Sequence, residues 1–303
     1  MQDLIARIQE LRAEKKAVIL AHVYTRPEVQ DIADYTGDSL GLSRKAAEKG
    51  TDHRMIVFCG VSFMAETASI LSPEKKVLMP DPGAGCPMAD MVTGEDVRAL
   101  RREHPGAAVA CYVNSTAEVK AESDVCVTSA NAVKIIGRLS EKKVIFVPDG
   151  SLGAYVQARV KDKEMVLWKG YCPTHHRMLR EHVESARAAH PLALVLAHPE
   201  NTPDLLELAD FIGSTGQMQE YVKKSGAREF LIASENGLVA RLSKDNPGKT
   251  ILPVSPLAVC PNMKKTTLPK VLDALENETH PVRVDPAVRQ RALAAIERML
   301  SLS

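Results

Sequence analysis

Three segments of the chain carry the same set of reactive side chains at the same spacing. In each segment two polar residues lie two positions apart at the end of an apolar run, an Asp follows twelve residues after the first, and a Ser or Thr follows five residues later. A cysteine ends each segment. His, Tyr and Glu are side chains that general acid–base catalysis uses, and thiolates bind metals. The three sets are His22, Tyr24, Asp34, Ser39 and Cys86; Tyr112, Asn114, Asp124, Ser129 and Cys172; and His198, Glu200, Asp210, Thr215 and Cys260.

Cys86, Cys172 and Cys260 occupy one repeated position, because they follow the first polar residue of their segments by 64, 60 and 62 residues. If three copies of one unit pack with these ends inward, the thiols converge without a fourth protein ligand. Thiolates suit an iron–sulfur cluster or zinc. A structural zinc site normally has four ligands and a CxxC element, and the chain has no CxxC. A metal centre with incomplete protein coordination is one interpretation, and three cysteines at a repeated core position are the other.

The remaining cysteines share no repeated position and lie within or at the ends of apolar runs, so we expect them in the core. The hydroxyl residue of each segment is expected to cap the N-terminus of a helix, because Ser and Thr are favoured N-caps. A helix N-terminus also offers free N–H groups to a phosphate or carboxylate. The core cysteines are Cys59, Cys111 and Cys126, and the hydroxyl residues are Ser39, Ser129 and Thr215.

Short apolar runs alternate with helical stretches in each segment, a pattern typical of parallel sheets covered by helices. The predicted fold class is α/β, with three repeated three-layer αβα units and parallel sheets around a pseudo-three-fold axis. Ligands of such sheets bind beyond the carboxyl ends of the strands, where the repeated residues lie. In the first unit we expect strands at residues 18–21, 34–37, 54–58 and 76–79.

We expect three domains. Residues 1–86 form unit 1, which the C-terminal helices in 266–303 complete, residues 87–172 form unit 2, and residues 173–265 form unit 3. A further helix is expected after Pro173, where it includes His175 and His176. These two histidines either support a metal site or, as we expect, only begin that helix.

Composition excludes several classes of protein. The chain has 303 residues and a formal net charge of +1 without a basic cluster, so nothing indicates binding to nucleic acid or to an anionic membrane. No apolar run reaches the roughly 18 residues of a membrane-spanning helix. The N-terminal stretch is a charged amphipathic helix rather than a signal peptide. We therefore expect a cytoplasmic protein with reduced cysteines.

Nine short sequence motifs, which include the repeated residues and are given at the end of this paragraph, together resemble quinolinate synthase over residues 17–275. The resemblance implies an enzyme of de novo NAD biosynthesis, the pathway to pyridine nucleotides. It condenses iminosuccinate (iminoaspartate) with dihydroxyacetone phosphate and gives quinolinate, phosphate and water. It also implies a functional link to L-aspartate oxidase or aspartate dehydrogenase, and three αβα domains around one oxygen-sensitive 4Fe-4S cluster. The motifs are AHVYTRPEVQDIADYTGDSL, GVSFMAETA, AGCPMADM, YVNSTAEVKAESD, CVTSANA, GYCPTHHR, AHPE, GSTGQM and CPNMKKTTL.

Matched motif by motif, the resemblance makes Cys86, Cys172 and Cys260 the cluster ligands and leaves one iron open as a Lewis acid. Acid–base catalysis is assigned to Tyr24, with Glu200 and His22 as further catalytic residues. The chain reads HVYT where HNYQ is common in the family, so the polar contacts of that Asn and Gln are in question. The implied substrate-binding residues are His22, Ser39, Tyr112, Asn114, Ser129, His198, Glu200 and Thr215.

Two other classes of function remain open on the residues alone. A zinc-dependent aldolase or hydratase would use the same three thiolates. A three-lobed protein that only binds small anions would use the same helix N-termini. Tyr24 and Glu200 favour an enzyme over the binding protein, because binding alone needs no paired acid and base.

Overall fold

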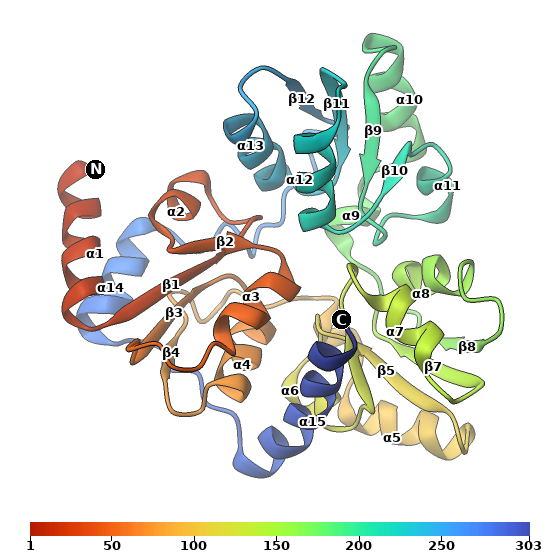
Figure 1. The fold of residues 1–303 in the computed structure, drawn as a ribbon, viewed down its shortest axis with the longest axis horizontal. Coiled ribbons are helices and arrows are strands. Elements are labelled where there is room, and N and C mark those ends of the chain that lie inside the picture. Colours follow the sequence, from red (N-terminus) through yellow and green to blue (C-terminus); the bar gives the residue numbers. More distant parts are fainter.

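The computed structural model describes residues 1–303 and contains three four-stranded parallel sheets, each flanked by helices. Figure 1 shows the three units grouped around a common centre. The strand order is the same in every sheet, with the first strand of a unit between its second and third strands and the fourth at the edge. The orders are β2-β1-β3-β4, β6-β5-β7-β8 and β10-β9-β11-β12. The α/β class with three repeated αβα units is therefore confirmed.

The strands are short and mostly buried, because helices cover both faces of each sheet. In the first unit each observed strand lies within one residue of its predicted bounds at either end. The strands are β1 (Ala17–His22), β2 (Tyr35–Gly37), β3 (Met55–Cys59) and β4 (Lys76–Leu78) in the first unit; β5 (Ala108–Tyr112), β6 (Val125–Val127), β7 (Lys143–Val147) and β8 (Glu164–Leu167) in the second; and β9 (Leu194–Ala197), β10 (Phe211–Ile212), β11 (Glu229–Ala233) and β12 (Thr250–Pro253) in the third.

The helices precede, connect and follow these strands. None has the length and the apolar character that crossing a membrane requires. They are α1 (Gln2–Glu14), α2 (Pro27–Ile32), α3 (Ser39–Ala46) and α4 (Ser62–Leu71); the 3-10 turn η1 (Ala89–Met91) with α5 (Gly94–Glu103), α6 (Ala117–Ala121), α7 (Ala132–Arg138) and α8 (Gly150–Gln157); α9 (Pro173–His176), α10 (Arg180–Ala189), α11 (Pro203–Leu206), α12 (Thr215–Lys224) and α13 (Asn236–Asp245); and α14 (Leu268–Asn277) and α15 (Pro286–Leu302).

The two C-terminal helices cover different units. Helix α14 packs against α1 and β3, as expected for helices that complete the first unit. Helix α15 packs mainly against α6 and β6, and its buried residues join the core of the second sheet. The expectation that both helices complete the first unit is therefore wrong for α15. An amphipathic helix shows in the sequence that it needs an apolar partner, but not which sheet provides it.

The repeated Asp has a structural role in all three units. The Asp34 Oδ2 atom accepts a hydrogen bond from the backbone N–H of Ile19 at 2.8 Å, and the Asp34 N–H donates to the Ile19 carbonyl at 2.9 Å. An Arg from the helix before the first strand pairs with each Asp carboxylate. These contacts fix the second strand of each unit beside the first. The equivalent pairs are Asp124 with Val109 and Asp210 with Val195.

We expect the Asp124→Ala substitution to lower stability without a direct effect on the cavity. It leaves the buried N–H of Val109 without the acceptor at 2.7 Å, which costs about 1–3 kcal/mol. Urea unfolding of the two proteins measures the loss. Asp162→Ala is the matched control, because Asp162 is exposed and its nearest cation lies 3.8 Å away. Equal unfolding midpoints for the Asp124 and Asp162 variants would contradict the structural role.

A second repeated contact shapes the turn after the first strand of each unit. The Thr25 hydroxyl donates to the His22 carbonyl at 2.8 Å, three residues back. The side chain at the equivalent position in the other units makes the same bond, and all three residues are fully buried. In the first unit this bond closes a turn from His22 to Thr25, which holds Tyr24 at the end of the sheet. The equivalent pairs are Ser115 with Tyr112 and Asn201 with His198.

Candidate active site

A single cavity of about 150 Å³ lies where loops at the carboxyl ends of strands from all three sheets meet. Every residue assigned to a site from the sequence lines it. The structure thus brings the repeated polar residues and the repeated cysteines together, while their roles in binding and catalysis remain predictions. The assigned lining residues are His22, Tyr24, Ser39, Tyr112, Asn114, Ser129, His198, Glu200, Thr215, Cys86, Cys172 and Cys260.

Each of the three cavity cysteines is followed by a proline, which begins a turn after Cys86 and Cys260 and helix α9 after Cys172. Backbone N–H groups of residues that follow each cysteine lower the pKa of its thiol. This effect favours the thiolate form that binds metals. These backbone groups belong to Ala89 and Met88 for Cys86, His175 for Cys172, and Met263 and Asn262 for Cys260.

Burial has the opposite effect on the pKa of these three thiols and disfavours the thiolate form. It raises the pKa of Cys86 to about 12 and the pKa of Cys172 well above its ordinary value, and it also raises the pKa of Cys260. The negative charge of Glu200 adds to the rise at Cys86 and Cys172. Three partly buried thiols with backbone N–H groups nearby fit a cationic metal group, because its charge would favour the ionised sulfurs.

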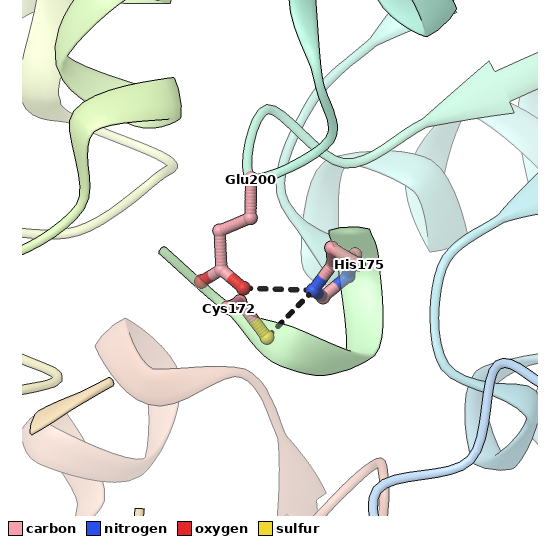
Figure 2. A group of neighbouring side chains, drawn as sticks. All are labelled: Cys172, His175 and Glu200. Atoms are coloured by element: carbon pink, nitrogen blue, oxygen red, sulfur yellow. Dashed lines mark hydrogen bonds and ion pairs between the residues drawn. The ribbon is translucent and has the colours of Figure 1, made fainter. Parts of the chain in front are cut away.

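His175 connects the Cys172 sulfur to Glu200 (Figure 2). Its Nδ1 atom lies 2.8 Å from Glu200 Oε2 and 3.2 Å from Cys172 Sγ. The three atoms that these residues offer to a metal lie within 4.8 Å of one another. The helix expected after Pro173 is confirmed as α9, and His175 within it also belongs to the site. The sequence prediction placed this histidine in the helix alone.

A path of hydrogen bonds continues from His175 to Tyr24 through Ser234, the residue after β11. The Ser234 Oγ atom lies 3.3 Å from His175 Nε2 and 2.7 Å from the Tyr24 hydroxyl. Burial and the negative charge of Glu200 raise the pKa of Tyr24 well above its ordinary value. The phenol therefore keeps its proton, and the path joins it to the Glu200 carboxylate.

Glu200 is a buried carboxylate surrounded by donors. The Tyr112 hydroxyl donates to Oε1 at 2.6 Å and the Asn114 Nδ2 atom at 3.4 Å. Burial raises its pKa, but the neighbouring His175 and His198 rings and the hydrogen bonds from His175 and Tyr112 outweigh burial, so the pKa falls below its ordinary value. Glu200 is therefore ionised. The Oδ1 atom of Asn114 is buried without a hydrogen-bond partner and is free to accept from a ligand.

His22 and His198 present the same edge of their rings to the cavity. Nδ1 of His22 accepts the N–H of Tyr24 at 3.1 Å, and Nδ1 of His198 accepts the N–H of Glu200 at 3.3 Å. Burial lowers the pKa of both rings to about 3, so they are neutral with the proton on Nε2. Nε2 of His198 donates to the Ser129 hydroxyl, 3.1 Å away. Each histidine therefore offers an N–H donor at the cavity.

The three hydroxyl residues do not cap their helices, contrary to the expectation. Asp38 caps α3 through the Gly41 N–H at 2.9 Å, and Ser214 caps α12 through the Gln217 N–H at 3.2 Å. Ser39 and Thr215 are instead the first residues of those helices. Ser129 lies in a turn three residues before α7 begins. The neighbours that act as caps leave Ser39 and Thr215 at the cavity wall.

The departure from the usual family motif does not change the cavity wall. Val23 is fully buried and packs in the core with Leu196 and Phe230, away from the cavity. Thr25 closes the turn to the His22 carbonyl. Neither side chain lines the cavity. The side chains that do, His22 and Tyr24, are those that match the family.

Sequence reasoning missed the polar residues that follow the third strand of the second and third units. Ser234 and Glu235 follow β11, and Asp149 follows β7 with its Oδ2 atom buried and unpartnered. The runs FLIASENG and VIFVPDG already showed polar residues at the end of a strand. Polar residues at the end of an apolar run are the same signal that identified the site residues after the first strand of each unit. The three cysteines expected in the core are all fully buried: Cys59, Cys111 and Cys126.

Comparison with known proteins identifies the family. The model of the family described as quinolinate synthetase A protein matches residues 6–301. The quinolinate synthase of Dehalococcoides mccartyi strain CBDB1 is 53% identical over 300 residues, which are 99% of this chain and 98% of the relative. Quinolinate synthase 1 of Methanosarcina acetivorans is 53% identical over 300 residues, again 99% and 98%. The quinolinate synthase of Geobacter sp. strain M21 is 52% identical over 301 residues, with the same coverage. The chain therefore belongs to the quinolinate synthase family of enzymes.

Proposed function

We propose that this enzyme condenses iminosuccinate with dihydroxyacetone phosphate and releases quinolinate, phosphate and water. The observation that carries the proposal is the single cavity, which gathers the polar residues and the cysteines that match the family's motifs from three separate units. A dicarboxylate and a phosphate ester need several N–H and O–H donors. The cavity provides donors from His22, His198 and the hydroxyl residues on its wall.

We further propose that Cys86, Cys172 and Cys260 hold one 4Fe-4S cluster. The support is their common cavity and the backbone N–H groups that lower the pKa of each thiol. Three protein ligands for four irons leave one iron open, and when bound the cluster supplies a Lewis acid there. The sulfur-rich donor set suits iron–sulfur chemistry better than hard cations.

Proton transfer is assigned to the chain's own side chains. The ionised Glu200 carboxylate accepts a proton from the bound substrate, and the protonated Tyr24 phenol donates one to an oxygen that leaves. His175 and Ser234 link the two groups through hydrogen bonds of 2.8, 3.3 and 2.7 Å, which hold the Glu200 carboxylate and the Tyr24 phenol in fixed positions at the cavity. Glu200, His175 and Ser234 are buried, which limits the access of bulk water to this part of the site.

A zinc enzyme is the second candidate, because one observation favours it. Cys172, His175 and Glu200 form a compact Cys, His and carboxylate group, which is a donor set for catalytic zinc. Metal analysis of anaerobically purified protein separates the two. We expect iron and acid-labile sulfide in equal amounts with a brown colour. Stoichiometric zinc without sulfide would contradict the cluster and support the zinc enzyme.

Loss of the Thr215 side chain, the first of α12, should affect substrate binding, whereas loss of the Ser214 cap should affect stability. We propose that Thr215 binds a substrate carboxylate or phosphate at the helix N-terminus, as Ser39 does at α3. Thr215→Ala is then expected to raise KM severalfold or more with little change in the melting temperature. Ser214→Ala removes the cap instead and should cost about 1 kcal/mol of stability. Steady-state kinetics and thermal unfolding of both variants measure these effects. Unchanged KM in the Thr215 variant would leave that residue without a role in binding.

A further inference from the structure

The carboxylate of Glu235 is completely buried, and its hydrogen-bond and ion-pair partners are all donors. Its Oε1 atom accepts the backbone N–H of Cys260 at 3.1 Å, and its Oε2 atom accepts the N–H of Gly237 at 2.6 Å. The Lys264 ammonium lies 2.9 Å from Oε1 and 3.1 Å from Oε2. A protonated carboxyl group would need an acceptor, and none of these partners is one. Glu235 is therefore a carboxylate paired with Lys264.

The same Lys264 reaches the loop that carries Tyr24. Its ammonium donates to the Tyr24 carbonyl at 2.5 Å, and the Arg26 Nε atom donates to the Lys264 carbonyl at 2.7 Å. The pair thus ties the end of β11 to the Cys260 loop of the third unit and to the loop after β1 of the first. Packing here leaves no space, because a Cβ atom on Gly237 would lie 2.8 Å from Glu235 Oε2 and 2.9 Å from Lys264 Nζ.

We propose that Glu235 and Lys264 form a buried ion pair that positions Cys260 against Tyr24 and balances the charge beside this sulfur. This inference rests on the proposed function, because it concerns the cysteine that would hold the cluster. Both residues act through others, so they are positioning residues and not catalytic ones. Their two charges are opposite: the Glu235 carboxylate contacts the Cys260 N–H directly, and the Lys264 ammonium contacts that carboxylate.

Opposite charges predict opposite effects on the reduction potential of the bound cluster. Net charge near an iron–sulfur cluster is one of the factors that set its potential, and a nearby cation stabilises the reduced, more negative form. Glu235→Gln leaves the Lys264 cation unbalanced and should raise the potential. Lys264→Met leaves the Glu235 anion unbalanced and should lower it. A contact that only supported the fold would disturb the cluster in the same way in both variants.

The test is a redox titration, followed by absorption and electron paramagnetic resonance, of the anaerobically purified wild type and four variants. We expect a higher midpoint potential for Glu235→Gln, a lower one for Lys264→Met, and the wild-type value for Lys264→Arg, which keeps the charge. Asp245→Asn is the control, because it breaks an exposed ion pair with Arg241 on α13. Should Glu235→Gln not fold, the difference between the Met and Arg variants at Lys264 decides the question alone.

Two failures are distinguishable. Wild-type protein that carries no iron and sulfide would overturn the proposed cofactor, and this inference with it. Wild-type protein with a cluster whose potential is the same in the Glu235 and Lys264 variants, or moves in one direction in both, would overturn the inference and leave the proposed function intact.

Discussion

Replacing any one of Cys86, Cys172 and Cys260 by Ser is expected to abolish the brown chromophore and the activity. Each cysteine reaches the cavity from a loop of a different unit, so none can take the position of another. Loss of a Lewis acid removes several kcal/mol of stabilisation, which corresponds to a fall in kcat of about a thousandfold or more. Iron and sulfide content together with kcat give the result.

The matched controls are the buried cysteines of the core, changed to Ala. Cys59, Cys111 and Cys126 are fully buried in packed strands, and each change should lower stability while the iron content stays at the wild-type level. Loss of iron from one of these variants, with retention in Cys86→Ser, would overturn the ligand assignment.

Tyr24→Phe is expected to lower kcat by roughly 10² to 10⁴ while the cluster and the binding of dicarboxylates are retained. The phenol keeps its proton because burial and the charge of Glu200 raise its pKa, and its hydroxyl ends the path through Ser234 to His175. Phe keeps the ring but not the O–H group. Kinetics with both substrates, and titration with a dicarboxylate analogue, measure turnover and binding separately.

Ser234→Ala provides a matched comparison for this prediction. It leaves the Tyr24 phenol in place but breaks the link to His175. Its kcat should fall less than that of Tyr24→Phe. Wild-type turnover in Tyr24→Phe would remove Tyr24 from the mechanism, even though the fold and the family stand.

The sheets could be predicted from the sequence because each unit repeats one pattern. Apolar runs and glycines place the strands, and three copies of the pattern constrain one another. The spacing from His22 to Cys86, repeated twice, also placed the cysteines at the same edge of each sheet. Cavity residues could therefore be found without knowledge of how the units pack.

The helix caps could not be predicted because two suitable residues are adjacent. Asp38 precedes Ser39, and Ser214 precedes Thr215, and all four are of types that cap helices. Only the backbone conformation determines which residue is the cap. In the structure the caps are Asp38 and Ser214, the first residue of each pair. At Ser129 the helix begins later, because Asn131 closes a turn on the N–H of Thr128.

Contacts between the units could not be predicted from the sequence either. The path from Tyr24 to Glu200 crosses from the first unit to the third, and the Glu235 pair with Lys264 depends on the same junction. No periodicity within one unit records which loop of another unit lies opposite. The proposed domain boundaries at residues 86 and 172 stay predictions, and α15 shows that a helix can cover a unit distant in sequence.

The most direct test of the account is product formation by the anaerobically purified protein. Iminosuccinate and dihydroxyacetone phosphate are supplied together or singly, and quinolinate and inorganic phosphate are measured by mass spectrometry and a colorimetric assay. The account predicts quinolinate and phosphate in equal amounts when both substrates are present, and no quinolinate with either substrate alone. Absence of quinolinate from protein that carries a complete 4Fe-4S cluster and binds both substrates would contradict it.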